Sequence, residues 1–231
     1  MAIISMLTLA LRPSPILLAT ESSQALIEDA TAVIRAMQNE KDMEIVGELL
    51  RGAEGVAIFS SVVKAGLVFG GRYGQGIVLK RDRNKDIWYG PHFVTLSGVF
   101  WGLQIGVQKT ALVMVIMNER GMKGFTGDKV TLGGDIAIAA GPVGRQTGVG
   151  TDGGFKAEIY SYSKSKGLFA GVSLEGSIIS SDNEVNEEFW GSRVPVENIL
   201  SRKSGDRGVE SLVKTIAGFQ SREAQKKDGS I

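Results

Sequence analysis

The chain has no cysteine and a single histidine, His92, among its 231 residues. The absence of cysteine excludes disulfides, thiolate metal sites, cysteine nucleophiles and a lipoprotein acylation site. One histidine leaves no second imidazole for a familiar metal centre or nucleophile relay, and because His92 follows Pro91 we interpret it as a turn residue. The side chains on which thiol-dependent and many metal-dependent enzymes rely are therefore scarce or missing.

Phosphate-binding and acid–base motifs are also missing. The segment GGRYGQG contains a GxG fragment, but nothing completes a dinucleotide fingerprint, and the GxxxxGK loop is absent. The carboxylates Glu158 and Glu175 lack a constellation that would support a hydrolase. We predict that the protein is not an enzyme and binds no cofactor. Three aspartates in glycine-rich turns are the candidates for a hard cation such as calcium, although their spacing lacks the EF-hand order: Asp128, Asp135 and Asp152.

Neither sign of charge dominates the chain. The net charge is +1, which gives no strong field toward nucleic acid, and we expect no nucleic-acid partner. The layout is uneven, because residues 64–85 hold six basic and one acidic side chain, whereas residues 21–54 hold eight acidic and three basic. A solvated face accounts for either run, and the basic stretch is in addition a candidate anion-binding patch.

The first 20 residues form a segment of their own. They are largely apolar, but Arg12-Pro13-Ser14-Pro15 interrupts them and no basic stretch precedes the apolar part. Two interpretations stay open: a poor or truncated secretory signal cleaved near Ala19 or Thr20, and an interfacial segment retained in the mature protein. The prolines argue against a continuous membrane-spanning helix. On this basis we favour an exported, periplasmic or membrane-associated protein over a cytoplasmic one.

Hydrophobic periodicity predicts one α+β domain over residues 21–219, followed by a solvated tail at 220–231. Helical spacing starts at Ser22 and recurs at 42–50 and 209–219. Between them lie short β-branched or aromatic runs separated by glycine, and glycine is unusually frequent, with 31 residues. The predicted fold is a glycine-rich antiparallel sheet, barrel-like or sandwich-like, flanked by N-terminal helices and a C-terminal helix.

A stretch without formal charge, residues 87–108 with His92 neutral, is long enough to suggest a membrane helix, but its pattern predicts strands. In WGLQIGVQ, residues 101–108, apolar residues alternate strictly with glycine and glutamine, which is typical of one strand with one apolar face. The following run ALVMVIM predicts a strand buried on both faces; a buried helical turn or an edge strand are the alternatives.

Four ordered segments resemble a known family. They are GVAIFSSVVKAGLVFGGRYGQGIVL (Gly55–Leu79), GLQIGVQ (Gly102–Gln108), the stretch Leu132–Arg145 with AAGPVGR, and YSYSKSKGLFAGVSLEG followed by NEEFWG. In order and spacing these segments are similar to the SYLF domain, a lipid-binding module. The resemblance covers about residues 24–191. Two departures stand out, since Ser61 replaces a usual proline in a turn and Trp190 stands where tyrosine is common.

The resemblance implies binding of anionic lipid without catalysis. In eukaryotic members the ligands are phosphoinositides, and actin is an additional partner in fungal ones. A domain standing alone, as here, is typical of the bacterial branch, for which actin binding is not expected. What transfers is association with an anionic phospholipid, through a phosphoinositide-like headgroup site, or with the cell envelope. The alternative is an envelope scaffold that binds another protein through a sheet edge or through the acidic surface Glu184–Glu188.

Cations and exposed backbone amides are what an anionic headgroup requires, and the KAGLVFGGRYGQG segment contains both kinds of group. The glycines of this segment also have a packing interpretation, as do the tyrosines Tyr160 and Tyr162 of the YSYS strand. The predicted lipid-binding residues are Lys64, Gly66, Gly70, Gly71, Arg72, Gly74 and Gly76. Auxiliary basic or aromatic contacts are predicted at Lys80, Arg81, Arg83, Lys85, Tyr162, Lys164, Lys166 and Phe169. For Arg145, which follows a tight turn, a salt bridge is at least as good an interpretation as a contact with the ligand.

Overall fold

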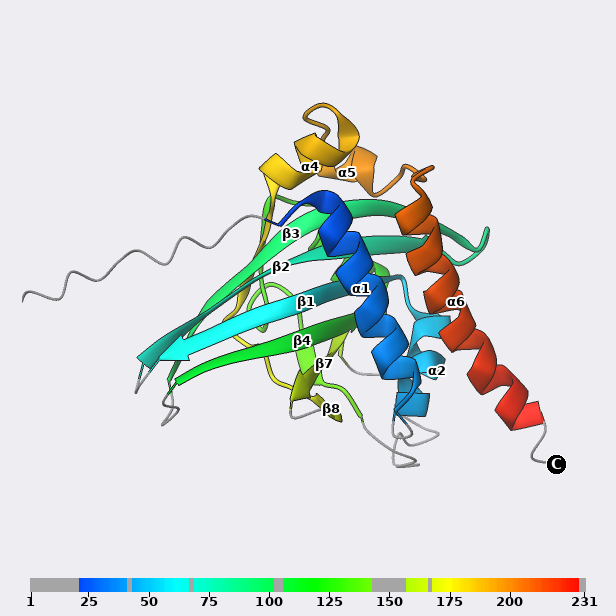
Figure 1. The fold of residues 1–231 in the computed structure, drawn as a ribbon, viewed down its shortest axis with the longest axis horizontal. Coiled ribbons are helices and arrows are strands. Elements are labelled where there is room, and N and C mark those ends of the chain that lie inside the picture. Colours follow the sequence, from blue (N-terminus) through cyan, green and yellow to red (C-terminus); the bar gives the residue numbers. More distant parts are fainter. Residues whose placement is uncertain are drawn as a thin grey trace, which may run out of the picture.

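The computed structural model describes residues 21–40, 43–66, 69–101, 106–142, 157–165 and 168–228. Helices lie mainly at the two ends of the chain and strands between them, which is the α+β arrangement that the sequence predicts (Figure 1). The helices are α1 (Ser23–Gln38), α2 (Glu44–Gly52), α3 (Glu119–Lys123), α4 (Asn183–Trp190), α5 (Val196–Ile199) and α6 (Arg207–Asp228). The strands are β1 (Gly55–Gly66), β2 (Phe69–Asp82), β3 (Ile87–Trp101), β4 (Gly106–Ile116), β5 (Lys129–Thr131), β6 (Ile138–Ala140), β7 (Ile159–Ser165), β8 (Leu168–Gly171) and β9 (Ile178–Ser181).

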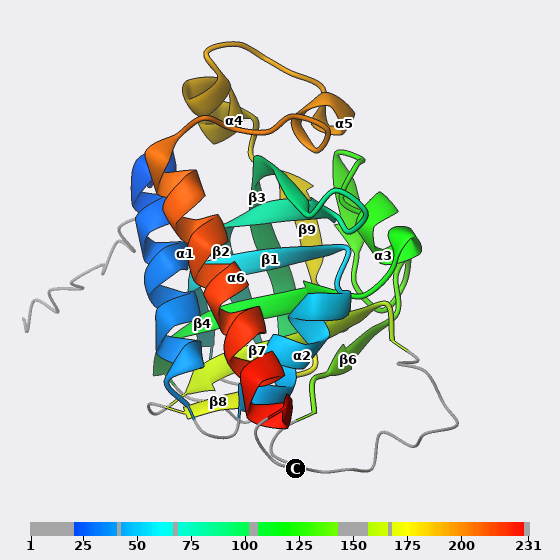
Figure 2. The same ribbon diagram turned by 90° about the vertical axis from the view of Figure 1, so that its right-hand side faces the viewer.

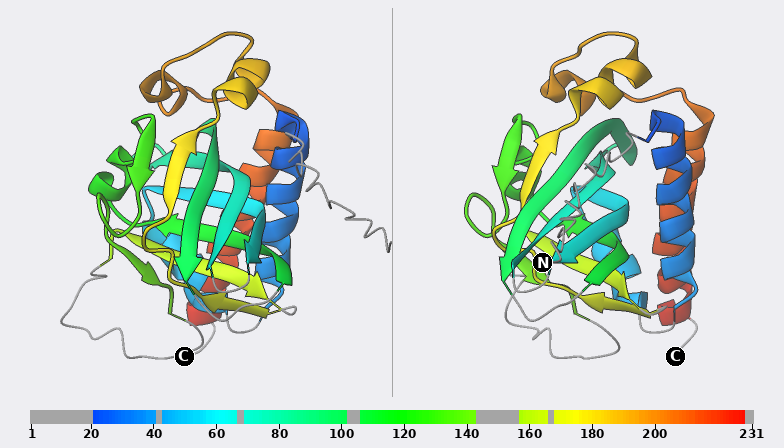
Figure 3. Two further views of the ribbon diagram at one scale, coloured as in Figure 1. Left: turned by 90° about the vertical axis from the view of Figure 1, so that its left-hand side faces the viewer. Right: turned by 60° about the vertical axis from the view of Figure 1, so that its left-hand side comes forward.

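The nine strands in the described part of the chain belong to one curled sheet. Its order is β5-β9-β3-β2-β1-β4-β7-β6, and β8 pairs with β7 outside this path. The pairs are antiparallel, as predicted, with the exception of the parallel pair β6 and β7. The curl is clear where the sheet is seen from its open side (Figure 3). The class prediction of a glycine-rich, barrel-like sheet with flanking helices is confirmed.

Helices α1, α2 and α6 cover one face of the sheet (Figure 2). The Ser22 hydroxyl caps α1 by accepting a hydrogen bond from the Ala25 amide at 3.3 Å, which satisfies one of the free amides of the first turn. One stripe of α1, including Ile27, Ile34 and Met37, is fully buried. This stripe joins apolar side chains of the sheet and of α6 in the larger core cluster.

A second core fills the opposite, concave face. It contains Phe59, Leu112 and Met114 from the central strands, and it is closed by Met122 and Leu200 from the short helical segments. Because β1 and β4 contribute alternate residues to the two cores, both strands are buried on both faces over much of their length. This confirms the prediction that ALVMVIM is a strand buried on both sides.

Several elements differ from their sequence-based predictions. The short runs predicted around the glycines join into two long strands, β1 and β2, and the turn expected near Ser61 is a register shift inside β1. The single strand predicted at 101–108 is wrong, because Trp101 ends β3 and Gly106 begins β4, which are not neighbours in the sheet. Helix α6 continues into the predicted tail and ends at Asp228. Within the described residues, no helix is both long and apolar enough to cross a bilayer.

Candidate functional site

The central strands extend past helix α1 at one end of the sheet. Helix α1 begins over β2 at the level of Gln75, whose Oε1 accepts a hydrogen bond from the Glu21 amide at 3.1 Å. Beyond this level β1–β4 project without helix cover (Figure 1). We call this projection the overhang and define it as residues 62–66, 69–74, 96–101 and 106–110. It contains the predicted lipid-binding residues with the exception of Gly76.

Two cations of the overhang lie side by side. Lys64 on β1 and Arg72 on β2 are direct cross-strand partners, and Lys64 follows the concave-facing Val62 by two residues, so both belong to the concave face. Lys64 Nζ lies 4.4 Å and Arg72 Cζ 5.9 Å from the centre of the Phe100 ring. Both cations therefore lie within cation–π distance of one aromatic ring, which attracts positive charge.

Burial disfavours the charged forms of both members of this pair. Burial, and then the neighbouring Arg72 guanidinium, lower the pKa of Lys64. Burial also lowers the pKa of Arg72, which is half-buried. The Arg72 Nε is fully buried and has no hydrogen-bond partner among the described residues. A bound anion would supply both the missing acceptor and the opposite charge.

The glycines beside the pair make room for aromatic rings and backbone. A Cβ at Gly70 would overlap the Phe100 ring and come within 2.5 Å of the Ala65 carbonyl oxygen. A Cβ at Gly76 would overlap the ring of Phe59 in the same way. At Gly74 and Gly66 the nearest backbone oxygens would lie 2.7 and 2.5 Å away, whereas at Gly71 the nearest atom would lie at an ordinary contact distance of 3.8 Å. Close packing thus explains most of these glycines, and their direct contact with lipid stays a prediction.

The second half of the basic stretch lies at the opposite end of the sheet. Arg81 is nine residues from Arg72 along β2, which corresponds to about 30 Å of strand. Arg81 pairs with Asp86 at 2.6 Å, Arg83 with Glu54 at 2.6 Å, and Lys85 with Asp82 at 3.4 Å. The side chains of 80–85 therefore do not join the Lys64–Arg72 pair in one patch, although they are continuous with it in sequence.

The remaining predicted contacts are dispersed. Tyr162 is fully buried in the helix-side core, and burial raises the pKa of its hydroxyl. Lys164 Nζ lies 5.3 Å from the centre of the buried Phe169 ring, beside a pocket of about 260 Å³ under α1. Lys166 and Arg145 lie outside the described residues. Of the metal candidates, Asp152 is also outside them, and the described part of the chain holds no cluster of three ligating side chains.

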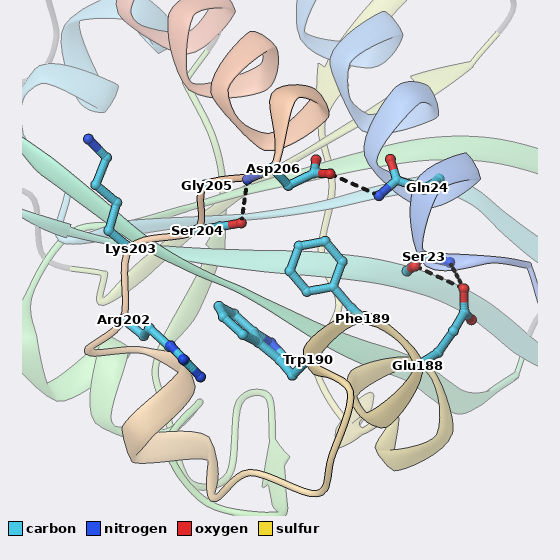
Figure 4. A pocket seen from close by; sticks show the side chains of 10 residues that line it. All are labelled: Ser23, Gln24, Glu188, Phe189, Trp190, Arg202, Lys203, Ser204, Gly205 and Asp206. Atoms are coloured by element: carbon cyan, nitrogen blue, oxygen red, sulfur yellow. Dashed lines mark hydrogen bonds between the residues drawn. The ribbon is translucent and has the colours of Figure 1, made fainter.

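A second concave site, which the sequence did not indicate, lies where the ends of α1, α4 and α6 meet (Figure 4). This pocket has a volume of about 450 Å³. Its polar groups bond to one another: Glu188 accepts from the Ser23 hydroxyl at 2.9 Å, and Gln24 donates to Asp206 at 3.1 Å. Since acidic and basic side chains both line it, the pocket shows no charge preference like that of the overhang.

The acidic surface predicted on α4 lies in the same region. Glu184, Glu187 and Glu188 are all exposed, and Glu188 in addition accepts the hydrogen bond from the Ser23 hydroxyl. Deeper in α4, the buried Asn186 holds the helix on β3, because its side chain accepts from the Phe93 amide at 2.9 Å and donates to the Phe93 carbonyl at 2.8 Å. The NEEFWG segment thus has a structural role in attaching α4 to the sheet.

The chain matches a family model and several known proteins. A family model described as "Ysc84: Las17-binding protein actin regulator" matches residues 97–219. The chain is 36% identical over 163 residues to LAS seventeen-binding protein 3 of Saccharomyces cerevisiae, covering 69% of this chain and 35% of that protein. It is 36% identical over 182 residues to SH3 domain-containing YSC84-like protein 1 of Xenopus laevis, covering 78% of this chain and 53% of that protein. The chain thus corresponds to about a third to a half of the length of these relatives.

Proposed function

Because the chain belongs to the Ysc84 (SYLF) family, we propose that it is a non-catalytic protein that associates with anionic phospholipid surfaces. The observation that carries this proposal is the Lys64–Arg72 pair on the overhang. Relatives are described as binding and regulatory proteins, which supports a binding role. The sheet places two cations next to each other, and the buried Arg72 Nε donor has no hydrogen-bond partner in the part of the chain that the structure describes. Both features favour a ligand that brings negative charge.

A phosphate of a lipid headgroup meets the requirements of this pair. It has several acceptor oxygens for the Arg72 guanidinium and carries a charge that reduces the repulsion between Arg72 and Lys64. Each basic side chain near an anionic membrane contributes about 1 kcal/mol of attraction, and this attraction falls off within a Debye length. Binding through the pair is therefore expected to prefer anionic over neutral lipid and to weaken as salt is added.

The proposal is tested by vesicle binding of the full chain. Lys64→Gln with Arg72→Gln removes two charges from the overhang, while Lys80→Gln with Lys85→Gln removes two charges from the opposite end of the sheet. The matched loss of charge separates a local site from a general electrostatic effect. We expect the first variant to lose about tenfold or more in affinity for vesicles containing phosphatidylglycerol, and the second to bind like the wild type.

Circular dichroism melting curves of both variants serve as the folding control, because Lys64 also contacts the Phe100 ring. Equal weakening of the two variants would reject the overhang as the site and leave a diffuse attraction. Absence of binding by the wild type to every vesicle would reject the proposed function itself.

Protein binding is the second candidate function, and the descriptions of the relatives favour it. The family is described as Las17-binding and actin-regulating, and the Saccharomyces cerevisiae relative LAS seventeen-binding protein 3 is named for binding LAS seventeen. For this chain a protein partner would use the exposed α4 surface with Glu184 and Glu187, or a sheet edge. Co-sedimentation with actin filaments is the first test, since the family description names an actin regulator. If the wild-type protein sediments with actin filaments and the Glu184→Lys, Glu187→Lys double variant does not, the α4 surface is supported as the binding site. If the wild-type protein does not sediment with the filaments, the result counts against actin as the partner.

A further inference from the structure

The helix-side face of the overhang has an apolar row that crosses four strands. The pairing register places Val99 of β3 opposite Gly71 of β2, Gly71 opposite Ala65 of β1, and Ala65 opposite Val107 of β4. Val99 and Val107 are 83% and 74% exposed. Phe69, two residues before Gly71 and therefore on the same face of β2, is 64% exposed. These three are among the four large apolar side chains that are most exposed in the described part of the chain.

The position of this row is as informative as its composition. Elsewhere the same face of the sheet is covered by α1, α2 and α6, whereas the overhang lies past the point where α1 begins (Figures 1 and 3). Four paired strands keep the row rigid, since each backbone in the projection is hydrogen-bonded to its neighbours. A rigid, projecting apolar surface is typical of a contact site and costs solubility unless it has a function.

Cations follow the apolar residues in a defined order along the strands. Counting from the end of the sheet, Phe69 comes first and the Val99–Val107 row second. The Lys64–Arg72 pair is one residue further, and Lys109 is one residue beyond that, opposite Val63. At about 3.3 Å per residue, the cations lie roughly 3 to 7 Å behind the valine row. Residues 62–74 and 96–110 contain these three cations and no aspartate or glutamate.

From this order we propose that the overhang enters an anionic membrane end-first, with Phe69, Val99 and Val107 in the outer acyl region and Lys64, Arg72 and Lys109 at the headgroups. The spacing matches an interface in which apolar groups are buried about 5–10 Å deep and cations remain at the phosphates. This inference rests on the proposed function and adds a depth and an orientation to it. The strands would stand upright on the bilayer, with the 80–85 hairpin far from it.

The charge of the overhang favours lipid over a second copy of the chain. Two copies docked through this surface would bring six cations together without an acidic group from either overhang to balance them. An anionic bilayer covers the same apolar row and neutralises the cations at the same time. The membrane is therefore the occupant to which both faces of the overhang are complementary.

The absence of cysteine makes a direct depth measurement simple, because any introduced thiol is unique. Val107→Cys places an environment-sensitive NBD label on the apolar row, and Asn84→Cys places the same label in the exposed turn at the opposite end of the sheet. Both labelled full-length proteins are mixed with vesicles of phosphatidylcholine and phosphatidylglycerol. We expect a blue shift and quenching by doxyl-labelled lipid at position 107, and neither change at position 84.

A charge-neutral variant gives an independent test. Val99→Ser with Val107→Ser keeps every cation, and we expect it to bind the same vesicles about tenfold more weakly at low and at high salt. The Lys64→Gln, Arg72→Gln variant is instead expected to lose most at low salt. Insertion is contradicted if wild type binds while the label at 107 behaves like that at 84, or if the serine variant binds like the wild type; the proposed function then survives.

Two further outcomes also overturn insertion. If the wild-type protein binds no vesicle, both the insertion and the proposed function are rejected. If the label at 107 is already shielded without lipid, another segment of the chain or a second copy covers the row, and light scattering shows which of these it is.

Discussion

At the scale of single residues, the overhang depends on glycine for its geometry. The Phe100 ring lies over Gly70, and this placement brings the ring next to Lys64 and Arg72. The sequence identified the glycines but not this reason for them, because the ring that needs the space comes from another strand. Lys64 and Arg72 were predicted as contacts, and their direct pairing required the register of β1 and β2.

We predict that Gly70→Ala destabilises the protein by about 1–3 kcal/mol, since the added methyl group would overlap the Phe100 ring and crowd the Ala65 carbonyl. The neighbouring Gly71→Ala is the matched control, because the nearest atom to its Cβ would be 3.8 Å away. Urea denaturation measures both. Equal stability of the two variants would show that the ring moves aside at no cost.

The buried His92 is predicted to make stability depend on pH. Burial lowers the pKa of His92 to about 4 in the folded protein, from 6.5 for a free imidazole, while its Nε2 lies 3.1 Å from the Ser181 hydroxyl. Unfolding therefore takes up a proton at intermediate pH. The contribution is fully present above about pH 6.5 and is lost as pH falls toward 4, by about 2–3 kcal/mol in total.

Measuring the free energy of unfolding of wild type and His92→Gln between pH 4 and 7 checks this prediction. The chain has only one histidine, so the difference between the two curves isolates it. We expect the wild-type curve to rise more steeply with pH. Parallel curves would mean that His92 is protonated in the folded protein or solvated within it.

At the scale of elements, local signals predicted the type of most elements but not their ends. Gly70, Gly71 and Gly74 interrupt the hydrophobic pattern and suggest turns, yet they continue one strand because flanking strands pair with them on both sides. Conversely, the alternation in 101–108 resembles one strand although β3 ends and β4 begins within it. Cross-strand pairing, which a local pattern does not contain, decided both cases.

The buried Asn186 amide is one of the contacts that attach helix α4 to the sheet, and we predict that Asn186→Ala destabilises the protein by about 2–4 kcal/mol. The substitution removes the side-chain acceptor of the buried Phe93 amide, while the Phe93 carbonyl keeps the hydrogen bond from the Asp182 amide. Glu187→Ala, exposed on the same helix, is the control and is expected to change stability by less than about 0.5 kcal/mol. Thermal melting of both variants tests this prediction. A small loss of stability for Asn186→Ala would mean that solvent replaces the hydrogen bonds of the amide.

At the scale of the whole molecule, the sheet has two ends with different electrostatic character. One end holds Lys64, Arg72 and Lys109 beside exposed apolar side chains. At the other end, Arg81 and Arg83 are bound in ion pairs with Asp86 and Glu54. Composition predicted one basic stretch at residues 64–85. In the structure, the length of β2 places Lys64 and Arg72 at one end of the sheet and the ion-paired hairpin 80–85 at the other. The separation gives the molecule a direction in which to meet a membrane.

The central claim is that this protein binds anionic membranes through charge on the overhang, and a salt titration of vesicle binding tests it most directly. Full-length wild-type protein is sedimented with phosphatidylcholine vesicles, with and without phosphatidylglycerol, from about 20 to 500 mM salt, a range over which the Debye length falls severalfold. We predict binding only to the anionic vesicles, with an affinity that falls by about tenfold or more across the range. Equal binding to both vesicle types, or an affinity unaffected by salt, would contradict the claim.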